Sequence, residues 1–120
     1  MNSDKNEKTK TVWYKVAELG SIMPNRVMTV TAGIHQICLV NYKDKITALD
    51  NHCPHQGGPL GEGQIENGWV ICPWHAYEYH PETGKAPEGF KDCVRLYPVE
   101  ERENGIFVAI EHFRKEQTRA

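Results

Sequence analysis

The sequence has no apolar run that approaches the roughly 18 residues needed to cross a membrane as a helix. Its first residues, MNSDKNEKTKT, are polar where a secretory signal peptide would have an apolar segment. These absences argue against a membrane span and against export. We therefore expect a cytoplasmic protein that makes no contact with a membrane.

The chain also lacks a strong excess of charge of either sign. It has 14 Lys and Arg against 16 Asp and Glu, a formal net charge of −2, and no basic stripe. Such a surface does not favour nucleic acid or an anionic membrane as a partner. At 120 residues the chain can bury one core without disulfide staples. The partners must therefore be inferred from a local site.

A helical period is missing too, because no segment of ten or more residues repeats its apolar positions every 3.6 residues. Short β-rich runs recur instead, separated by turn signals such as Asn67-Gly68 and Asn104-Gly105. The runs are 12–17, 26–32, 35–42, 46–50, 69–73, 76–80, 93–99 and 106–110. This pattern predicts an all-β fold, an antiparallel sandwich or partial barrel. We expect flexible tails at 1–11 and 113–120 and one domain over 12–112.

Two loops interrupt the strand pattern, and both contain cysteine and histidine. The first reads Cys53-Pro54-His55 and the second Cys72-Pro73-Trp74-His75, which together give C-x-H-x16-C-x2-H. In a reducing cytoplasm such cysteines suit metal ligation better than disulfides. The other two, Cys38 and Cys93, lie in β-like runs and are interpreted as small core residues.

Four such ligands fit either tetrahedral zinc or an iron-sulfur centre with mixed ligands. In common zinc fingers the two cysteines form one close pair and the two histidines another. Here each loop supplies one cysteine and one histidine. This order favours a two-iron cluster gripped from both sides, while a zinc site, or loops that bind no metal, remain the alternatives.

The segments CPHQGGPLG and CPWHAYEY resemble the two cluster-binding loops of Rieske iron-sulfur proteins, and the strands from about Val12 to Ile110 resemble the whole Rieske domain. The resemblance implies a small cluster-binding subdomain, about 51–90, that holds one 2Fe-2S cluster. It implies that Cys53 and Cys72 bind the inner iron, and that His55 and His75 bind the outer iron near the surface.

The resemblance also gives roles to residues around the ligands. Gly57 and Gly58 would permit close approach of the backbone to the cluster. Trp74 would shield the cluster, and with Gly58, Pro59 and Leu60 it would form a small apolar docking patch. Pro87 matches the family's third, proline-containing loop, although a proline here also fits an ordinary turn.

The sequence departs from the high-potential members of the family at two points. Their loops carry an extra disulfide, but the matching residues here are Gly58 and Trp74, and Tyr77 stands where those members have a serine. Fewer hydrogen bonds to the cluster predict a potential toward the lower end of the Rieske range, about −150 to 0 mV. Tyr79 matches a tyrosine whose hydroxyl reaches a cysteine sulfur in high-potential members, and packing on a strand is the alternative interpretation.

A fully ligated cluster leaves no open position for a substrate, so the resemblance implies a one-electron carrier rather than an enzyme. The expected donor is a flavin-dependent reductase and the expected acceptor an oxygenase or another reductase; no small-molecule substrate is expected. The chain is too short for the mononuclear iron domain of ring-hydroxylating oxygenase subunits. Two alternatives remain: a small subunit of a larger reductase, such as NADH-dependent nitrite reductase, and a redox-sensing module.

Overall fold

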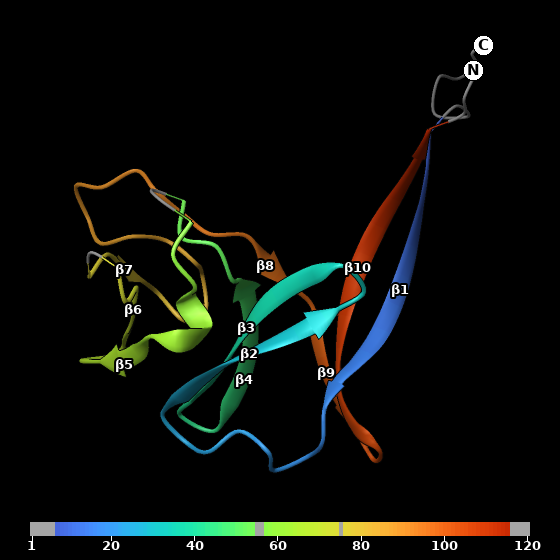
Figure 1. Ribbon diagram of the computed structural model, residues 1–120, viewed down its shortest axis with the longest axis horizontal. Coiled ribbons are helices and arrows are strands. Elements are labelled where there is room, and N and C mark those ends of the chain that lie inside the picture. The colour runs from blue at the N-terminus through green and yellow to red at the C-terminus, as the bar shows by residue number, and fades with distance from the viewer. Residues whose placement is uncertain (1–6, 55–56, 75, 116–120) are drawn as a thin grey trace.

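The computed structural model describes residues 7–54, 57–74 and 76–115, and these residues form an almost entirely β structure (Figure 1). Within this part of the chain, the only helical segment is a 3-10 turn, η2 (Leu60–Glu62). The strands are β1 (Glu7–Ala17), β2 (Arg26–Ala32), β3 (His35–Tyr42), β4 (Lys45–Asp50), β5 (Gln64–Glu66), β6 (Trp69–Ile71), β7 (Glu78–Tyr79), β8 (Leu96–Tyr97), β9 (Val99–Arg102) and β10 (Gly105–Lys115).

The strands form three antiparallel sheets, in the orders β1-β10-β9, β2-β3-β4-β8 and β5-β6-β7. They do not close into a barrel. The predicted all-β class is therefore confirmed. No helix in the described residues is long and apolar enough to cross a membrane.

Two tight turns lie where the sequence predicts them. Asn67 and Gly68 connect β5 to β6 with φ values of 52° and 86°, as a tight turn with two positive φ angles requires. Lys43 and Asp44 make the same kind of turn between β3 and β4, with φ values of 54° and 62°. These short connections fix the register of the hairpins, and so fix which side chains face each core.

The structure differs from the sequence prediction at the strand boundaries. β5 was not predicted, and the run at 93–99 is broken into an isolated bridge at Cys93 and the short strand β8, with β9 beginning at Val99. β1 and β10 pair from Glu7↔Lys115 to Ala17↔Ile106, beyond the predicted domain limits at 12 and 112. Polar composition suggested tails there, but continuous backbone pairing with a partner strand forms a long ribbon instead.

The centre of β3, residues 37–40, is buried on both faces, which explains its unbroken apolar run. Ile37 and Leu39 face a core shared with β10, whereas Cys38 and Val40 face a second core. This second core also contains Cys53, Cys72 and Tyr79 together with Leu49, Leu60, Val70 and Val94. The cysteine loops are therefore packed against the central sheet.

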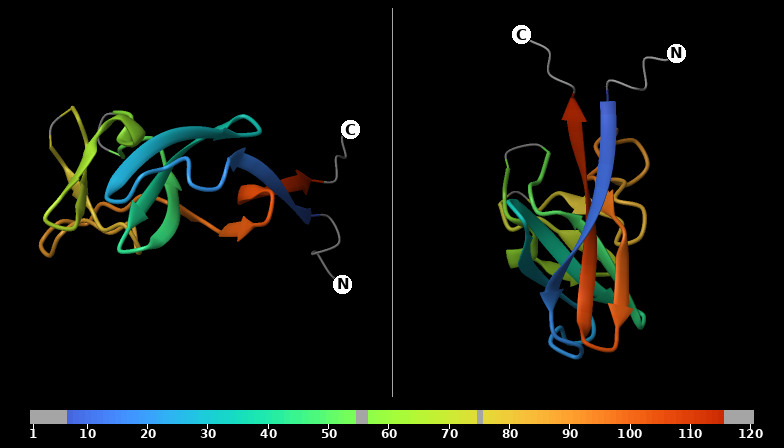
Figure 2. Two further views of the ribbon diagram at one scale, coloured as in Figure 1. Left: turned by 90° about the horizontal axis from the view of Figure 1, so that it is seen from below. Right: turned by 90° about the vertical axis from the view of Figure 1, so that its right-hand side faces the viewer.

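The cysteine loops and the free end of the ribbon lie at opposite ends of the molecule. Figures 1 and 2 show β5, β6 and β7 with the neighbouring loops on one side of the central sheet, and the β1–β10 ribbon projecting from the other. The site is therefore carried by a small subdomain built on a sheet whose opposite face is stabilised independently.

Candidate metal centre

The two cysteines of the motif are buried side by side beneath the loops that carry them. Cys53 and Cys72 are each 2% exposed, and their thiols are in hydrogen-bond contact. Burial raises the pKa of the Cys72 thiol, and the nearby Cys53 raises it further, whereas the backbone N–H of Trp74 donates to the sulfur and lowers it. Two adjacent thiols with a backbone donor suit a shared cationic centre, which would favour their thiolate forms.

The two loops are built on the same backbone pattern. In the first, Gly57 N–H donates to the Cys53 carbonyl at 2.7 Å, and Cys53 N–H donates to the Gly58 carbonyl at 2.9 Å. In the second, Ala76 N–H donates to the Cys72 carbonyl at 3.0 Å, and Cys72 N–H donates to the Tyr77 carbonyl at 2.8 Å. In each loop, therefore, the cysteine carbonyl accepts a backbone hydrogen bond from the fourth residue after it, and the cysteine N–H donates one to the carbonyl of the fifth residue after it.

The equivalent fourth residue after each cysteine has a positive φ, 77° at Gly57 and 61° at Ala76. A positive φ suits glycine but is strained for alanine. The spacing of cysteine and histidine differs between the loops, C-x-H against C-x2-H, yet the closure is the same. The described parts of the loops therefore form a matched pair around the two sulfurs.

Gly58, on the first loop, lies against the sulfur and the tryptophan of the second loop. A Cβ on Gly58 would lie 2.9 Å from Cys72 Sγ and 3.0 Å from Cγ and Cδ2 of Trp74. No side chain can enter this space without displacing the sulfur or the indole. In high-potential members, the positions of Gly58 and Trp74 are the ones that carry the extra disulfide. Here a glycine lies against a tryptophan ring instead.

Tyr79 contacts the first sulfur from β7. Its hydroxyl lies 3.2 Å from Cys53 Sγ, and the side chain is 1% exposed. Burial, together with the contact to Cys53, raises the pKa of Tyr79 well above its usual range. The phenol therefore keeps its proton, and it would donate to Cys53 Sγ when that sulfur is a metal-bound thiolate. The hydrogen-bonding interpretation of Tyr79 fits this geometry, and the ring also packs in the core.

Asn51 fixes the start of the first loop and was not identified from the sequence. It is 1% exposed, its carbonyl accepts Leu60 N–H at 2.8 Å, and its side-chain Oδ1 accepts Gly61 N–H at 2.7 Å. Thr29 on β2 also donates to Oδ1, at 3.4 Å. Asn51 thus joins both ends of the loop to the central sheet, but asparagine after a strand is too common to reveal this role from the sequence.

Other predicted site residues lie around this centre. Pro87 and Tyr77 line a cavity together with Tyr79, the residue whose hydroxyl contacts Cys53 Sγ. Trp74 is 51% exposed, as a docking residue would be. Leu60, however, was predicted for the same surface and is fully buried in the second core. Cys93 is exposed rather than buried, whereas Cys38 is buried as expected.

His55 and His75 lie outside the described residues. The described part of the site fits an iron-sulfur cluster on its own chemistry, because two buried sulfurs meet beneath matched loops with a phenol donor and a glycine-lined approach. A separate metal site of three or more His, Cys, Asp or Glu is not found among the described residues.

Residues 12–98 match the sequence family of the Rieske 2Fe-2S domain. The chain belongs to this family. Its cofactor is accordingly one Rieske-type 2Fe-2S cluster, and the match includes both cysteine loops and the strands that carry them.

Relatives of this Rieske domain occur in chains of different size. It is 29% identical over 85 residues to the ferredoxin component of the alkene monooxygenase system of Xanthobacter autotrophicus, which covers 70% of each chain. It is 32% identical over 111 residues to the vanillate O-demethylase oxygenase subunit of a Pseudomonas species. That match covers 82% of this chain but spans only 29% of the relative.

A solved structure shares the fold. The ferredoxin of carbazole 1,9a-dioxygenase from Nocardioides aromaticivorans superposes with a TM-score of 0.73 at 23% identity, covering 81% of this chain and 96% of that one. The Rieske fold is therefore shown by sequence and by structure.

Proposed function

We propose that Cys53 and Cys72 bind one iron of the cluster, that His55 and His75 bind the other, and that the chain is a one-electron carrier. The observation that supports it best is the geometry of the two loops, which close identically around adjacent buried sulfurs. When bound, the cluster supplies a centre that accepts and releases one electron.

The surrounding residues position and protect that centre. The central sheet and Leu60 exclude water from the cysteine side, and Tyr79 donates to Cys53. Trp74 is half exposed over Gly58 on the loop that also carries His75. We infer that electrons leave at the histidine side, because the opposite side is buried against β3 and β4.

The carrier would accept electrons from a flavin-dependent reductase and pass them to an oxygenase, in the cytoplasm, where its cysteines would stay reduced. Support comes from the alkene monooxygenase ferredoxin component, which is matched over 70% of its length. The proposal assigns the domain no substrate of its own. A fixed subunit of a larger reductase, or a redox sensor, would predict other behaviour in the same assay.

The purified protein should contain two irons and two inorganic sulfides per chain, and after reduction it should show the low-average-g electron resonance of a mixed-ligand cluster. Given a ferredoxin reductase and NADH, it should reduce cytochrome c. His75→Ala and Cys53→Ser should remove the signal, whereas His112→Ala, which changes a histidine on β10, should keep it. A colourless protein with one zinc would overturn the proposal.

A further inference from the structure

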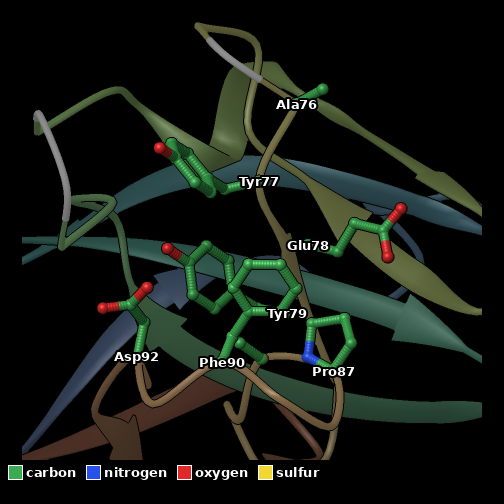
Figure 3. A pocket seen from close by; sticks show the side chains of 8 residues that line it. Ala76, Tyr77, Glu78, Tyr79, Pro87, Phe90 and Asp92 are labelled. Carbon is green, nitrogen blue, oxygen red and sulfur yellow. The ribbon is translucent and has the colours of Figure 1, made fainter.

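A cavity of about 340 Å³ lies on the surface between β7 and the turn at residues 86–92. Its apolar lining comes from Ala86, Pro87 and Phe90, with the ring of Tyr79 behind them, and Glu78 and Asp92 lie beside it. Figure 3 shows these two carboxylates on opposite sides of the rings of Tyr79 and Phe90. The cavity thus combines an apolar floor with a carboxylate at each side.

The turn holds Phe90 out toward solvent. Phe90 N–H donates to the Pro87 carbonyl at 3.0 Å, Ala86 N–H donates to the Asp92 carbonyl at 3.0 Å, and Gly89 has a φ of 97°. Phe90 is nevertheless 61% exposed. The turn therefore presents an aromatic ring to solvent beside the cavity, which an aliphatic or cationic side chain of a partner could pack against.

The charge of this end of the molecule indicates the kind of partner. Residues 51–92 contain six acidic side chains and two lysines, a formal charge of −4. The rest of the chain has the other 10 acidic and 12 basic side chains, a charge of +2. Two lysines, Lys85 and Lys91, flank the turn, yet the end that carries the cluster loops is acidic overall. It therefore complements a basic surface.

The cavity is also connected to the cluster-binding sulfurs. Tyr79 lines it, and the hydroxyl of the same side chain lies 3.2 Å from Cys53 Sγ. A cation bound over Glu78 would therefore be separated from the cluster by about one side chain. It would stabilise the additional negative charge of the reduced state more than it stabilises the oxidised state.

We propose that this cavity binds a lysine or arginine of the electron acceptor, and that the reduced protein binds the acceptor more tightly than the oxidised protein. The aliphatic part of the side chain lies against Phe90 and Pro87, and its cation lies at Glu78. By linkage, tighter binding to the reduced form raises the potential when the cavity is filled. The acceptor is thus held while an electron is present and released afterwards. This inference rests on the carrier function proposed above.

The test compares three variants of the full chain loaded with its cluster. Glu78→Gln removes an exposed carboxylate at the cavity, and Phe90→Ala removes the displayed ring. Glu103→Gln is the matched control, because it removes an exposed carboxylate from the turn between β9 and β10, away from β7 (Figure 1). The visible spectrum of each variant verifies that the cluster is intact.

The first measurement is the midpoint potential with and without saturating pentalysine at low ionic strength. Unit charges roughly 10 Å apart near a protein surface predict a two- to tenfold tighter complex with the reduced form. A threefold difference corresponds to a rise of about 28 mV for one electron. The wild type and Glu103→Gln should show this rise, whereas Glu78→Gln and Phe90→Ala should lose at least half of it.

The second measurement is the rate at which each reduced variant passes one electron to cytochrome c, a basic acceptor whose ferric haem becomes ferrous. At low salt, Glu78→Gln and Phe90→Ala should react about threefold more slowly than Glu103→Gln. Equal rates and equal potential shifts in all variants would overturn the cavity proposal and leave the carrier function intact. If the loaded wild type does not reduce cytochrome c at all, the carrier function itself fails.

Discussion

At the scale of single residues, the site depends on contacts with the two buried sulfurs. Tyr79 reaches Cys53 Sγ at 3.2 Å, and Gly58 leaves the space that Cys72 Sγ and Trp74 occupy. The aromatic side chains Tyr77 and Tyr79 alternate along one short segment, and only the geometry separates their roles. Tyr77 and Tyr79 both line the cavity; the Tyr77 carbonyl accepts Cys72 N–H, whereas the Tyr79 hydroxyl lies 3.2 Å from Cys53 Sγ.

Tyr79→Phe should lower the reduction potential. The phenol donates to the Cys53 sulfur and stabilises the more negative, reduced cluster, so its loss favours the oxidised form. A hydrogen bond worth about 0.5–1.5 kcal/mol corresponds to roughly 20–65 mV for one electron. Redox titration followed by electron resonance measures the shift. The control is Tyr14→Phe, which removes a hydroxyl in contact with His112 and should leave the potential unchanged. If Tyr79→Phe also leaves the potential unchanged, Tyr79 acts only through packing.

Cys38 should make stability depend on alkaline pH. Burial raises the pKa of its thiol from 9.0 to about 12, so the folded state keeps a proton that the unfolded state releases. A raised pKa gives stability that is complete below about pH 9 and is lost as the pH rises toward 12. The loss should approach about 1.4 kcal/mol per pH unit.

Urea unfolding between pH 9 and 11 measures this dependence. Cys38→Ala should be less stable at neutral pH because it leaves a cavity, yet its free energy of unfolding should fall less steeply with pH. Parallel slopes in the wild type and the variant would show that Cys38 ionises equally in both states.

At the scale of elements, the two loops are positioned by backbone bonds and close packing rather than by regular structure. η2 lies against β2, and a Cβ on Gly61 would lie 2.1 Å from Thr29 Oγ1 and 2.7 Å from Thr29 N. Asn51 fixes the same segment through Gly61 N–H. The first loop is therefore anchored at both ends before any metal binds, and the second is anchored through β6 and β7.

Neighbouring glycines in the first loop provide a matched test of this packing. Gly58→Ala should lower the iron content and the thermal stability, because the new Cβ would overlap Cys72 Sγ and Trp74. Gly57→Ala should cost only about 1–2 kcal/mol, since its Cβ meets no atom of the described residues within 4 Å and only the φ of 77° is strained. Iron analysis and thermal unfolding of both variants compare the two effects. Similar losses in both would mean that strain, rather than space, governs the loop.

At the scale of the whole molecule, the central sheet separates two cores. One core lies between this sheet and the β1-β10-β9 sheet, and the other contains the cysteines. Among the described residues, the first core shares none with the cluster loops. The cofactor is therefore expected to stabilise one half of the protein more than the other.

Removing the cluster, by a chelator with a reductant or by Cys53→Ser, should loosen residues 51–90 and leave the strands outside them folded. In hydrogen exchange, amides of β6 and β7 should lose protection, while those of the β1–β10 pairing near Val108 should keep it. Loss of protection throughout would show that the cluster organises both cores.

Much of this architecture was predictable from local chemistry. Asn67-Gly68 determined a hairpin because both residues tolerate positive φ, and alternating or continuous apolar runs determined β2, β3 and β4. The spacing of Cys53, His55, Cys72 and His75 determined the family, because this arrangement of ligand types along the chain is specific. The ribbon beyond residues 12 and 112 was not predictable, since its polar strands pair only because their partners lie opposite.

The sequence by itself determined which side chains are able to bind a cluster and that the chain forms strands, because ligand chemistry and turn preferences are local properties. Only the tertiary structure decided that Cys53 and Cys72 meet beneath matched loops, that Asn51 anchors one of them and that Phe90 stands beside a cavity lined by Tyr79. These relations depend on packing between segments far apart in the chain. No local pattern of residues specifies them.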